Sequence, residues 1–597
     1  RLLEVDHPNG RERYEYDQRG LRSARIVSLK RDGGELVVVT RYEYDAEGHL
    51  VATTLPDGSR LRYERNGQGQ VVALKRQPVA TPWLRALARE QVIASGFERD
   101  LFGLRGFRAG NGMRTLHERT RTGTLVRVVH LRADERGAPV RNARALLPIA
   151  PGQPLAARIE RLFGISAAHA AQANTDADVT QPVEAADGQA LEGALPRLQE
   201  TVASADAILL DYQYVWDPEG NLLHARRREP DGPLPSTRRS QAYDLRNQLV
   251  ASVEWRDDGD VLAETAVWRY AYDRHQRRVL AQEGAVSQQE LAGHTRPTHF
   301  APGSHRALSS SPRAANVPAR AAASRPHEAA TPGHHDASGQ PERFGTRSLR
   351  WDALGRLIEV RAGERSIARY AYDHRGLRIA RTRFDPAMVA PTTTHTVYDD
   401  ARQPLAELDA DGRLIRQYLW LADLPLAVLD TPARPDSATD SARRILADLG
   451  RIAQSWLAPQ AGLAWLHTNH LGAPELATDA DGEPLWRARH APFGAATVTT
   501  SPRRPDFTLD LRLPGQVFDA ETGLHYNRRR YYAPTLGQYL TPDPLGTPDG
   551  PNPYAYAAFN PLRNVDPDGL VLFAFDGTGN SDDLNDPAMA GSGLSNV

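Results

Sequence analysis

The stretch Tyr16-Asp17-Gln18-Arg19-Gly20-Leu21 contains the unit that decides the fold: an aromatic residue, then Asp, then Gly two or three positions on, then an apolar residue. The residues that flank the unit alternate between apolar and polar, which is typical of a β-strand. In this unit the aromatic residue ends a strand, the Asp carboxylate accepts hydrogen bonds from the turn backbone, and Gly takes a positive φ that a side chain would obstruct. Each unit therefore predicts one β-hairpin.

The unit recurs along most of the chain. Clear copies begin at Tyr16, Tyr44, Trp216, Trp351 and Tyr372, and degenerate copies begin at Tyr243, Tyr272 and Tyr398. A single copy is a common turn signal and indicates nothing more, but eight copies indicate a repeat. Because an isolated hairpin is marginal in water, we expect the hairpins to pair edge to edge in a long antiparallel sheet.

The composition favours a thin wall over a large solid core. Hydrophobic residues make up 40% and charged residues 25% of the 597 residues, and the mean hydropathy is -0.52. Lys and Arg number 73 against 74 Asp and Glu, so the net charge of -1 gives no general field for nucleic acid or an anionic membrane. The absence of Cys excludes disulfides and thiolate metal sites, and no apolar run reaches the roughly 18 residues of a transmembrane helix. The chain begins with Arg1 rather than Met, so we expect it to be a piece of a longer protein.

Two regions interrupt the repeats. Residues 144–206 include the Ala-rich stretch 155–163, whose apolar spacing predicts a small helical insertion, followed by a polar, mobile stretch. Residues 288–341 are rich in Pro, Ser, Ala and His and have no apolar period, which predicts a disordered loop. The pair His334-His335 lies in that loop, where nothing fixes a ligand geometry, so we expect solvated side chains there.

Further along, His467 and His470 have the spacing of two metal ligands within the stretch 466–472. No third ligand accompanies them, so the pattern favours a structural role. We expect no metal site and no cofactor in this chain.

The segment 515–570 carries two Asp-Pro-x-Gly sequences, which begin at Asp543 and Asp566. Each one alone is simply a good turn. The two are far enough apart for a chain reversal to bring their carboxylates together. Two carboxylates in one water-poor site can share a proton, so that one acts as general base on water and the other as general acid toward a scissile amide.

The eight repeat units and the segment 515–570 together resemble the Rhs/YD-repeat family of polymorphic toxins, including Rhs effectors of type VI secretion. The resemblance implies a mainly β fold, in which a YD-repeat sheet winds into a hollow, closed cocoon that holds a toxin. It also implies that residues 514–570 form a core plug and aspartyl autoprotease. In that interpretation Asp543 and Asp566 are the catalytic pair, and the chain is cut between Leu570 and Val571.

The plug departs from the family pattern at two positions. The family usually has Asp where this chain has Ala533 and a basic residue where it has Gln538, which puts the local charge partners of the plug and the rate of cleavage in doubt. Arg528, Arg529 and Arg530 either steady a carboxylate or an oxyanion or form a solvated basic face.

After the expected cut, the apolar run 571–575 predicts a strand that enters a Gly-rich turn. A phosphate-binding loop would need a lysine that is missing here. The turn resembles instead the opening of an α/β-hydrolase family that includes phospholipase effectors, which implies that the C-terminal toxin is a serine lipase. No G-x-S-x-G nucleophile elbow occurs in the chain, so its serine is expected beyond Val597. The expected active-site loop of the toxin consists of Asp576, Gly577, Thr578, Gly579 and Asn580.

The resulting organisation is a shell over residues 1–513, the plug and autoprotease over 514–570 and the start of the toxin over 571–597. The resemblance implies a protein made in the bacterial cytoplasm, secreted and delivered to target cells. The expected partners are the chain's own enclosed toxin, a cognate immunity protein, spike or adaptor proteins of the secretion system, and target-cell lipid, with no nucleic acid. Two alternatives remain open: an uncut YD-repeat adhesive or structural protein, and an insecticidal toxin-complex cage that carries a different toxin.

Overall fold

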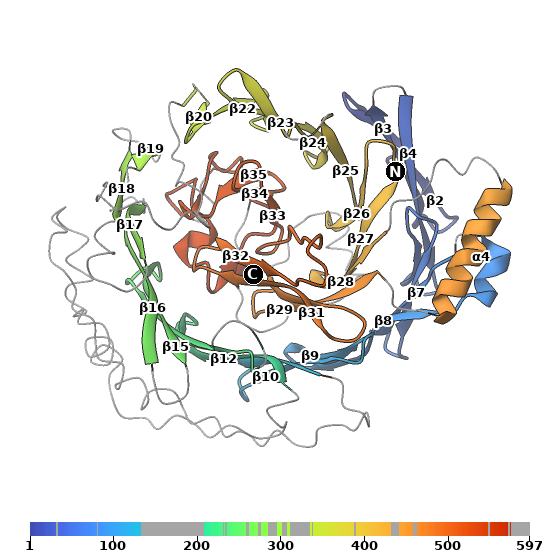
Figure 1. Ribbon diagram of the computed structural model, residues 1–597, viewed down its shortest axis with the longest axis horizontal. Helices are drawn as coiled ribbons and strands as arrows, with labels where there is room; N and C mark the ends of the chain where they lie inside the picture. The colour runs from blue at the N-terminus through green and yellow to red at the C-terminus, as the bar shows by residue number, and fades with distance from the viewer. Residues whose placement is uncertain are drawn as a thin grey trace.

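The computed structural model describes residues 1–132, 208–284, 295–300, 307–310, 335–431, 441–457, 462–570 and 573–574, with short gaps inside these ranges. Two large antiparallel sheets, of 19 and 13 strands, form a wall around the C-terminal residues (Figure 1). Within each sheet every strand pairs with the next one along the chain, for example β2 with β3 and β27 with β28. The expected mainly β fold with large antiparallel sheets is confirmed.

The first sheet consists of β1 (Glu4–His7), β2 (Gly10–Tyr16), β3 (Arg22–Arg31), β4 (Gly34–Tyr44), β5 (Leu50–Thr54), β6 (Arg60–Arg65), β7 (Val71–Gln77), β8 (Gln91–Asp100), β9 (Gly103–Ala109), β10 (Arg114–Arg119), β11 (Leu125–Leu131), β12 (Ile208–Trp216), β13 (Leu222–Arg228), β14 (Thr237–Tyr243), β15 (Leu249–Asp257), β16 (Leu262–Tyr272), β17 (Arg278–Gly284), β18 (Thr295–Phe300) and β19 (Ala307–Ser310). The second sheet consists of β20 (Arg343–Phe344), β21 (Arg347–Trp351), β22 (Leu357–Ala362), β23 (Arg365–Tyr372), β24 (Arg378–Arg383), β25 (Thr392–Tyr398), β26 (Pro404–Leu408), β27 (Leu414–Leu421), β28 (Leu424–Asp430), β29 (Leu463–Thr468), β30 (Pro474–Thr478), β31 (Pro484–His490) and β32 (Ala496–Thr500).

The repeat units form the turns that the sequence predicts. In seven of the eight units a carboxylate oxygen of the Asp accepts a hydrogen bond from the backbone N–H four residues later, as between Asp17 and Leu21 at 2.8 Å. The eighth, at Asp273, lies outside the described residues. Gly20 has a φ of 89° in the first unit and Gly376 has a φ of 80° in another. Backbone with these φ values is strained in any residue that has a side chain. Local turn chemistry therefore sets the strand order.

The two sheets pack face to face along part of the wall. Leu74 of β7, Ile93 of β8 and Leu210 of β12 share one buried cluster with Ala427 of β28 and Trp465 of β29. Segments more than 300 residues apart in sequence therefore lie side by side, and the later strands of the second sheet lie inside the first.

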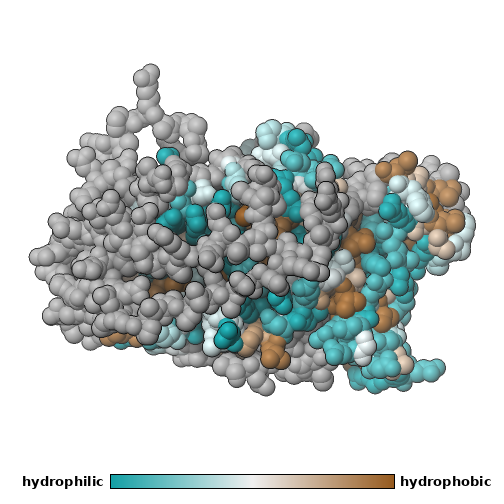
Figure 2. Space-filling model, turned by 90° about the horizontal axis from the view of Figure 1, so that it is seen from below, coloured by the Kyte–Doolittle hydropathy of each residue, from teal (hydrophilic) through white to brown (hydrophobic). Residues whose placement is uncertain are grey.

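One helix, α4 (Ser441–Leu457), lies outside the wall against a short 3-10 helix, η1 (Pro82–Leu87) (Figure 1). A side-chain oxygen of Asp448 accepts the backbone N–H of Thr81 at 2.8 Å, and the indole of Trp456 donates to the carbonyl of Leu87 at 2.9 Å. Hydrophobic residues gather at this end of the molecule (Figure 2), where Trp83 and Trp456 are exposed. This helix was not predicted from the sequence. No helix in the described part of the chain is both long and apolar enough to cross a bilayer.

The core segment lies within the wall as a small sheet of β33 (Val517–Asp519), β34 (Leu524–Asn527), β35 (Arg530–Ala533) and β36 (Gln538–Tyr539), followed by the 3-10 helix η4 (Ala557–Phe559) (Figure 1). A buried ion pair holds it to the wall: Arg378 of β24 donates from Nη2 to Asp519 Oδ1 at 2.8 Å, and Arg381 donates to the same oxygen at 2.9 Å. The Tyr526 ring stacks on Arg378 at 4.3 Å. The core is thus anchored by charge as well as by apolar packing.

Three expectations differ from the structure or fall outside it. In the described residues neither sheet closes on itself, so the closed cocoon is not formed by these strands alone. The segment 288–341, expected to be a disordered loop, contains β18 and β19, because the antiparallel pairing continues through the backbone where the side-chain pattern gives no strand signal. The helical insertion expected at 144–206 lies outside the described residues.

Candidate active site

The hairpin of β34 and β35 brings two polar side chains to one face. Asn527 and Arg530 are directly opposite each other across the hairpin, so their side chains project from the same side of it. Asn527 Nδ2 donates to the backbone carbonyl of Asp566 at 2.8 Å and to the hydroxyl of Tyr539 at 2.7 Å. Asn527, Arg530 and Tyr539 are all buried, which keeps this face poor in water.

Both carboxylates that the sequence singles out meet at Arg530. Its Nη2 lies 2.8 Å from Asp543 Oδ2 and 3.1 Å from Asp566 Oδ2, so the two oxygens are no farther apart than the sum of these distances. Asp543 is 9% exposed, Asp566 2% and Arg530 3%. From the sequence, Arg530 could either steady a carboxylate or belong to a solvated basic face. The structure places it between the two carboxylates, at the centre of the site.

Asp566 also contacts the backbone beside the expected cut. Its Oδ1 accepts a hydrogen bond from the N–H of Leu570 at 2.9 Å, and its Oδ2 accepts one from the hydroxyl of Tyr539 at 2.7 Å. Arg530 Nε donates to the carbonyl of Gly569 at 2.6 Å. The loop that ends at Leu570 is thus held at the carbonyl of Gly569 and at the N–H of Leu570.

Gly569 is needed at its position for two reasons. Its φ is 70°, and a Cβ atom there would lie 2.4 Å from the carbonyl oxygen of Asn527. Only a residue without a side chain lets this loop approach the β34–β35 hairpin so closely. The glycine of the second Asp-Pro-x-Gly turn therefore places the backbone against the site.

Burial governs the protonation of this site. It raises the pKa of Asp566 to about 6, against the lowering effects of Arg530 and of the hydrogen bond from Tyr539, while the charge of Asp543 raises it further. Burial, followed by the charge of Asp566, holds the pKa of Tyr539 well above its usual range, so Tyr539 remains a hydrogen-bond donor. Asp566 is therefore half protonated near pH 6, and a minor protonated fraction remains at neutral pH.

The chain returns past the site in a second hairpin. The strand β37 (Asn564–Val565) pairs with β38 (Phe573–Ala574), so the described residues 566–570 follow β37 in the connection between the two strands. A strand was expected over 571–575, and the structure forms one at Phe573–Ala574. Val571 and the expected toxin loop Asp576, Gly577, Thr578, Gly579 and Asn580 lie outside the described residues.

Two features near the site bear on other expectations. Asp568 pairs with Arg528 and, at 3.2 Å, with Arg402, which follows β25 in the wall. Ala533 and Gln538, the two departures from the family pattern, lie opposite each other in the β35–β36 pair.

The histidines expected to be structural make protein contacts. His467 Nε2 lies 2.9 Å from the hydroxyl of Thr478, and His470 Nε2 lies 2.8 Å from the carbonyl of Leu562.

Comparison with known proteins gives one family match and several relatives. The family described as RHS Repeat matches residues 38–77, which span β5, β6 and β7 and most of β4. Toxin protein Tse5 of Pseudomonas aeruginosa is 31% identical over 264 residues, which cover 40% of this chain and 20% of that protein. Double-stranded DNA deaminase toxin A of Burkholderia cenocepacia is 27% identical over 625 residues, which cover 96% of this chain and 40% of that protein.

Solved structures share the fold. The Tc holotoxin pore of Photorhabdus luminescens matches 95% of this chain with a TM-score of 0.65 and 18% identity, and this chain covers 24% of that one. The chain therefore spans less than half of each of these three proteins. The chain therefore contains a segment that matches the RHS Repeat, is similar in sequence to bacterial toxins, and shares its fold with the Tc holotoxin pore.

Proposed function

We propose that this chain is the shell and self-cleaving core of a secreted toxin, and that Asp543 and Asp566 cut the peptide bond between Leu570 and Val571. One observation carries the proposal. The two carboxylates converge on one guanidinium nitrogen, and one of them also binds the N–H of the residue whose carbonyl would be attacked. In this assignment residues 1–513 are the shell, 514–570 the plug and autoprotease, and 571–597 the start of the toxin.

The two carboxylates take different roles in the reaction. Asp566, with its raised pKa, is the general acid, and Asp543 is the general base. Asp543 takes a proton from water as the water oxygen adds to the carbonyl carbon of Leu570. The C–N bond then breaks, and Asp566 gives its proton to the nitrogen of Val571. The products are a carboxylate on Leu570 and an amine on Val571.

Arg530 has two effects in this scheme. Its charge compensates the buried carboxylates, which would otherwise be costly to ionise. Its Nε also fixes the carbonyl of Gly569, which limits the movement of the loop before the cut. The arrangement differs from a simple pair of carboxylates that share one proton, because a cation lies between them.

Substitution of each carboxylate by its amide tests the proposal. Asp543→Asn and Asp566→Asn nearly preserve shape, so the chain should fold and stay uncut, whereas the wild type should give a second polypeptide that begins at Val571. Asp568→Asn is the matched control, since Asp568 lies in the same turn but faces Arg402 and Arg528. N-terminal sequencing and denaturing mass spectrometry distinguish the products. Cutting that persists in both Asp543→Asn and Asp566→Asn would overturn the assignment and favour an uncut adhesive or structural protein.

The expected chemistry of the toxin is lipid hydrolysis, which rests on the turn at 576–580 alone. A second candidate is action on nucleic acid, which is favoured by the name of the DNA deaminase toxin that matches 96% of this chain. The expectation that the protein has no nucleic-acid partner therefore holds only if the toxin is a lipase. The full-length protein, assayed on phospholipid vesicles and on double-stranded DNA, separates the two: release of fatty acid supports the lipase, and deamination or cleavage of DNA supports the second candidate.

We also infer secretion from the bacterial cytoplasm into target cells and retention of the cut toxin by the shell. A cognate immunity protein and spike or adaptor proteins are the partners that such delivery requires. Co-purification of the two cleavage products through gel filtration would support retention, and their separation without denaturant would contradict it.

A further inference from the structure

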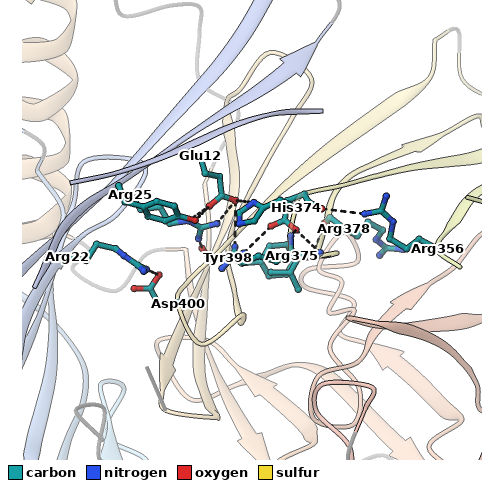
Figure 3. A network of polar contacts seen from close by, with 12 residues as sticks. Glu12, Arg22, Arg25, Arg356, His374, Arg375, Arg378, Tyr398 and Asp400 are labelled. Atoms are coloured by element: carbon teal, nitrogen blue, oxygen red, sulfur yellow. Dashed lines mark hydrogen bonds and ion pairs between the residues drawn. The ribbon is translucent and has the colours of Figure 1, made fainter. Parts of the chain in front are cut away.

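The first strands of the chain meet the second sheet at a seam that is rich in charge (Figure 3). Arg25 of β3 donates to the backbone carbonyl of Tyr398, Arg22 pairs with Asp400, and Asn9 Nδ2 donates to the carbonyl of Tyr372 at 2.8 Å. Glu12 and His374 point toward each other across this seam. The seam therefore joins segments that are more than 360 residues apart.

Three possible metal ligands converge at the seam. His7 ends β1, Glu12 lies in β2, and His374 follows β23. One ligand atom from each of these residues lies within 4.8 Å of the other two, and His374 Nδ1 is 3.8 Å from Glu12 Oε1. Two ligands in a tetrahedral zinc site are about 3.4 Å apart, given bonds of about 2.0–2.1 Å. Only a small closing movement separates these side chains from a ligand geometry.

His7 is the second observation that favours a bound ion. His7 is only 8% exposed, and neither of its ring nitrogens has a hydrogen-bond partner among the described residues. A buried imidazole without a partner loses hydrogen bonds to water and regains none. Coordination to a metal would satisfy one of these nitrogens. His374 is exposed, which gives an ion a path from solvent.

Glu12 offers one oxygen to an ion. Its Oε2 accepts hydrogen bonds from Arg25 at 2.9 Å and from the Tyr14 hydroxyl at 2.7 Å, whereas Oε1 accepts one from Arg25 at 2.9 Å and keeps a second lone pair, with Arg375 Nη2 farther away at 3.8 Å. Asp373 and Glu12 both place negative charge beside the His7 ring. Two imidazoles and one carboxylate suit Zn²⁺, whereas Ca²⁺ and Mg²⁺ prefer oxygen ligands throughout.

We propose that His7, Glu12 and His374 bind one Zn²⁺ ion, with water in the fourth position, and that this ion fastens the first hairpin to the second sheet. The site differs from the expectation that the chain holds no metal. That expectation rested on short sequence spacings, and these three ligands are brought together only by the fold. The proposal does not depend on autoproteolysis.

Zinc uptake by the purified full chain tests the proposal. Metal content after dialysis against Zn²⁺ is measured by plasma mass spectrometry, and Tm is measured with Zn²⁺ and with EDTA. Three variants are compared with the wild type: His374→Gln, His7→Gln, and the control His395→Gln. His395 is also buried with both ring nitrogens unpartnered among the described residues, but it belongs to no such group.

The expected result is one Zn²⁺ more per chain in the wild type and in His395→Gln than in His374→Gln or His7→Gln. Zn²⁺ should also raise Tm relative to EDTA only in the first two proteins. If His7→Gln does not fold, His374→Gln decides alone, because His374 is an exposed residue whereas His7 is buried. Equal zinc content in the wild type and in His374→Gln, or a zinc-dependent rise in Tm that persists in His374→Gln, overturns the proposal. Histidines elsewhere in the chain affect all variants equally.

Discussion

Removal of the Arg530 charge is the sharpest test of the electrostatics of the site. Arg530→Met keeps most of the side-chain length but leaves the buried carboxylates of Asp543 and Asp566 without this cation. Removal of one partner from a buried ion pair costs about 3–5 kcal/mol. We expect the free energy of unfolding to fall by about that amount at pH 8, and cleavage after Leu570 to slow at least tenfold.

The loss of stability should shrink in acid. In the wild type the pKa of Asp566 is already raised from 3.8 to about 6, mainly by burial. A shift of this size corresponds to roughly 3 kcal/mol of cost for the ionised form. Because Arg530 lowers this pKa, Arg530→Met should raise it further. A carboxyl with a raised pKa contributes stability below its unfolded pKa and loses it as pH rises through the folded pKa, so the variant should be closer to the wild type at pH 5 than at pH 8.

Urea unfolding at pH 5 and pH 8, together with N-terminal sequencing of the products, measures both effects. Arg529→Met is the matched control, because Arg529 lies in the same hairpin turn and is exposed. An Arg530→Met protein that unfolds within about 1 kcal/mol of the wild type at pH 8, or that cuts at the wild-type rate, would refute this account of the site.

Three further predictions concern the anchor, the loop and the sheet interface. Asp519→Asn removes the charge that the buried Arg378 and the half-buried Arg381 share, so urea unfolding should show a loss of about 3–5 kcal/mol; a loss below about 1 kcal/mol would contradict the anchor. Gly569→Ala should stop cleavage, as seen on denaturing gels, because the Cβ would clash with Asn527 in addition to the strain of a positive φ; Gly546→Ala in the other Asp-Pro-x-Gly turn has the φ strain but no clash and should still cut. Equal cutting in both would count against the close approach. Burial lowers the pKa of His130 to about 4 and that of His467 well below its usual range, and their Nδ1 atoms lie 3.3 Å apart. The stability that the neutral pair contributes should therefore be lost as pH falls from about 6.5 toward 4, and Tm measured over that range should fall less in His467→Gln.

The turns of the wall were predictable because their chemistry is local. The Asp of each unit bonds a backbone N–H only four residues away, and a positive φ at Gly20 or Gly376 needs no distant partner. The helix α4 also left a signal that was missed, since Ile445, Leu449 and Ile452 have helical spacing. The packing of β28 and β29 against β8 depends on residues far apart in sequence, and no local pattern reports it.

The candidate site was predictable in part. Asp543 and Asp566 stand out by their repeated Asp-Pro-x-Gly context, and the structure brings them together. Arg530 does not stand out, because three consecutive arginines offer the same chemistry. Only the strand register, which places Arg530 opposite Asn527, decides which of the three faces the carboxylates.

The two departures from the family pattern are explained by the same register. Ala533 and Gln538 are opposite each other and buried, so the loss of an acid at one and of a base at the other leaves no unpaired buried charge. At these two positions, therefore, no buried charge in the plug lacks its partner.

The seam has a consequence for synthesis of the chain. Arg25 reaches its partner carbonyl at Tyr398 only after 373 further residues have been made, which takes about 20–75 s at bacterial rates of about 5–20 residues per second. During that interval the face of the first hairpin is uncovered. Glu12 and Arg25, however, belong to the paired strands β2 and β3, and they neutralise each other within that hairpin. The charges of Glu12 and Arg25 in the nascent hairpin are therefore already paired before Tyr398 is made. Charged residues of this kind also discourage pairing with the wrong strand.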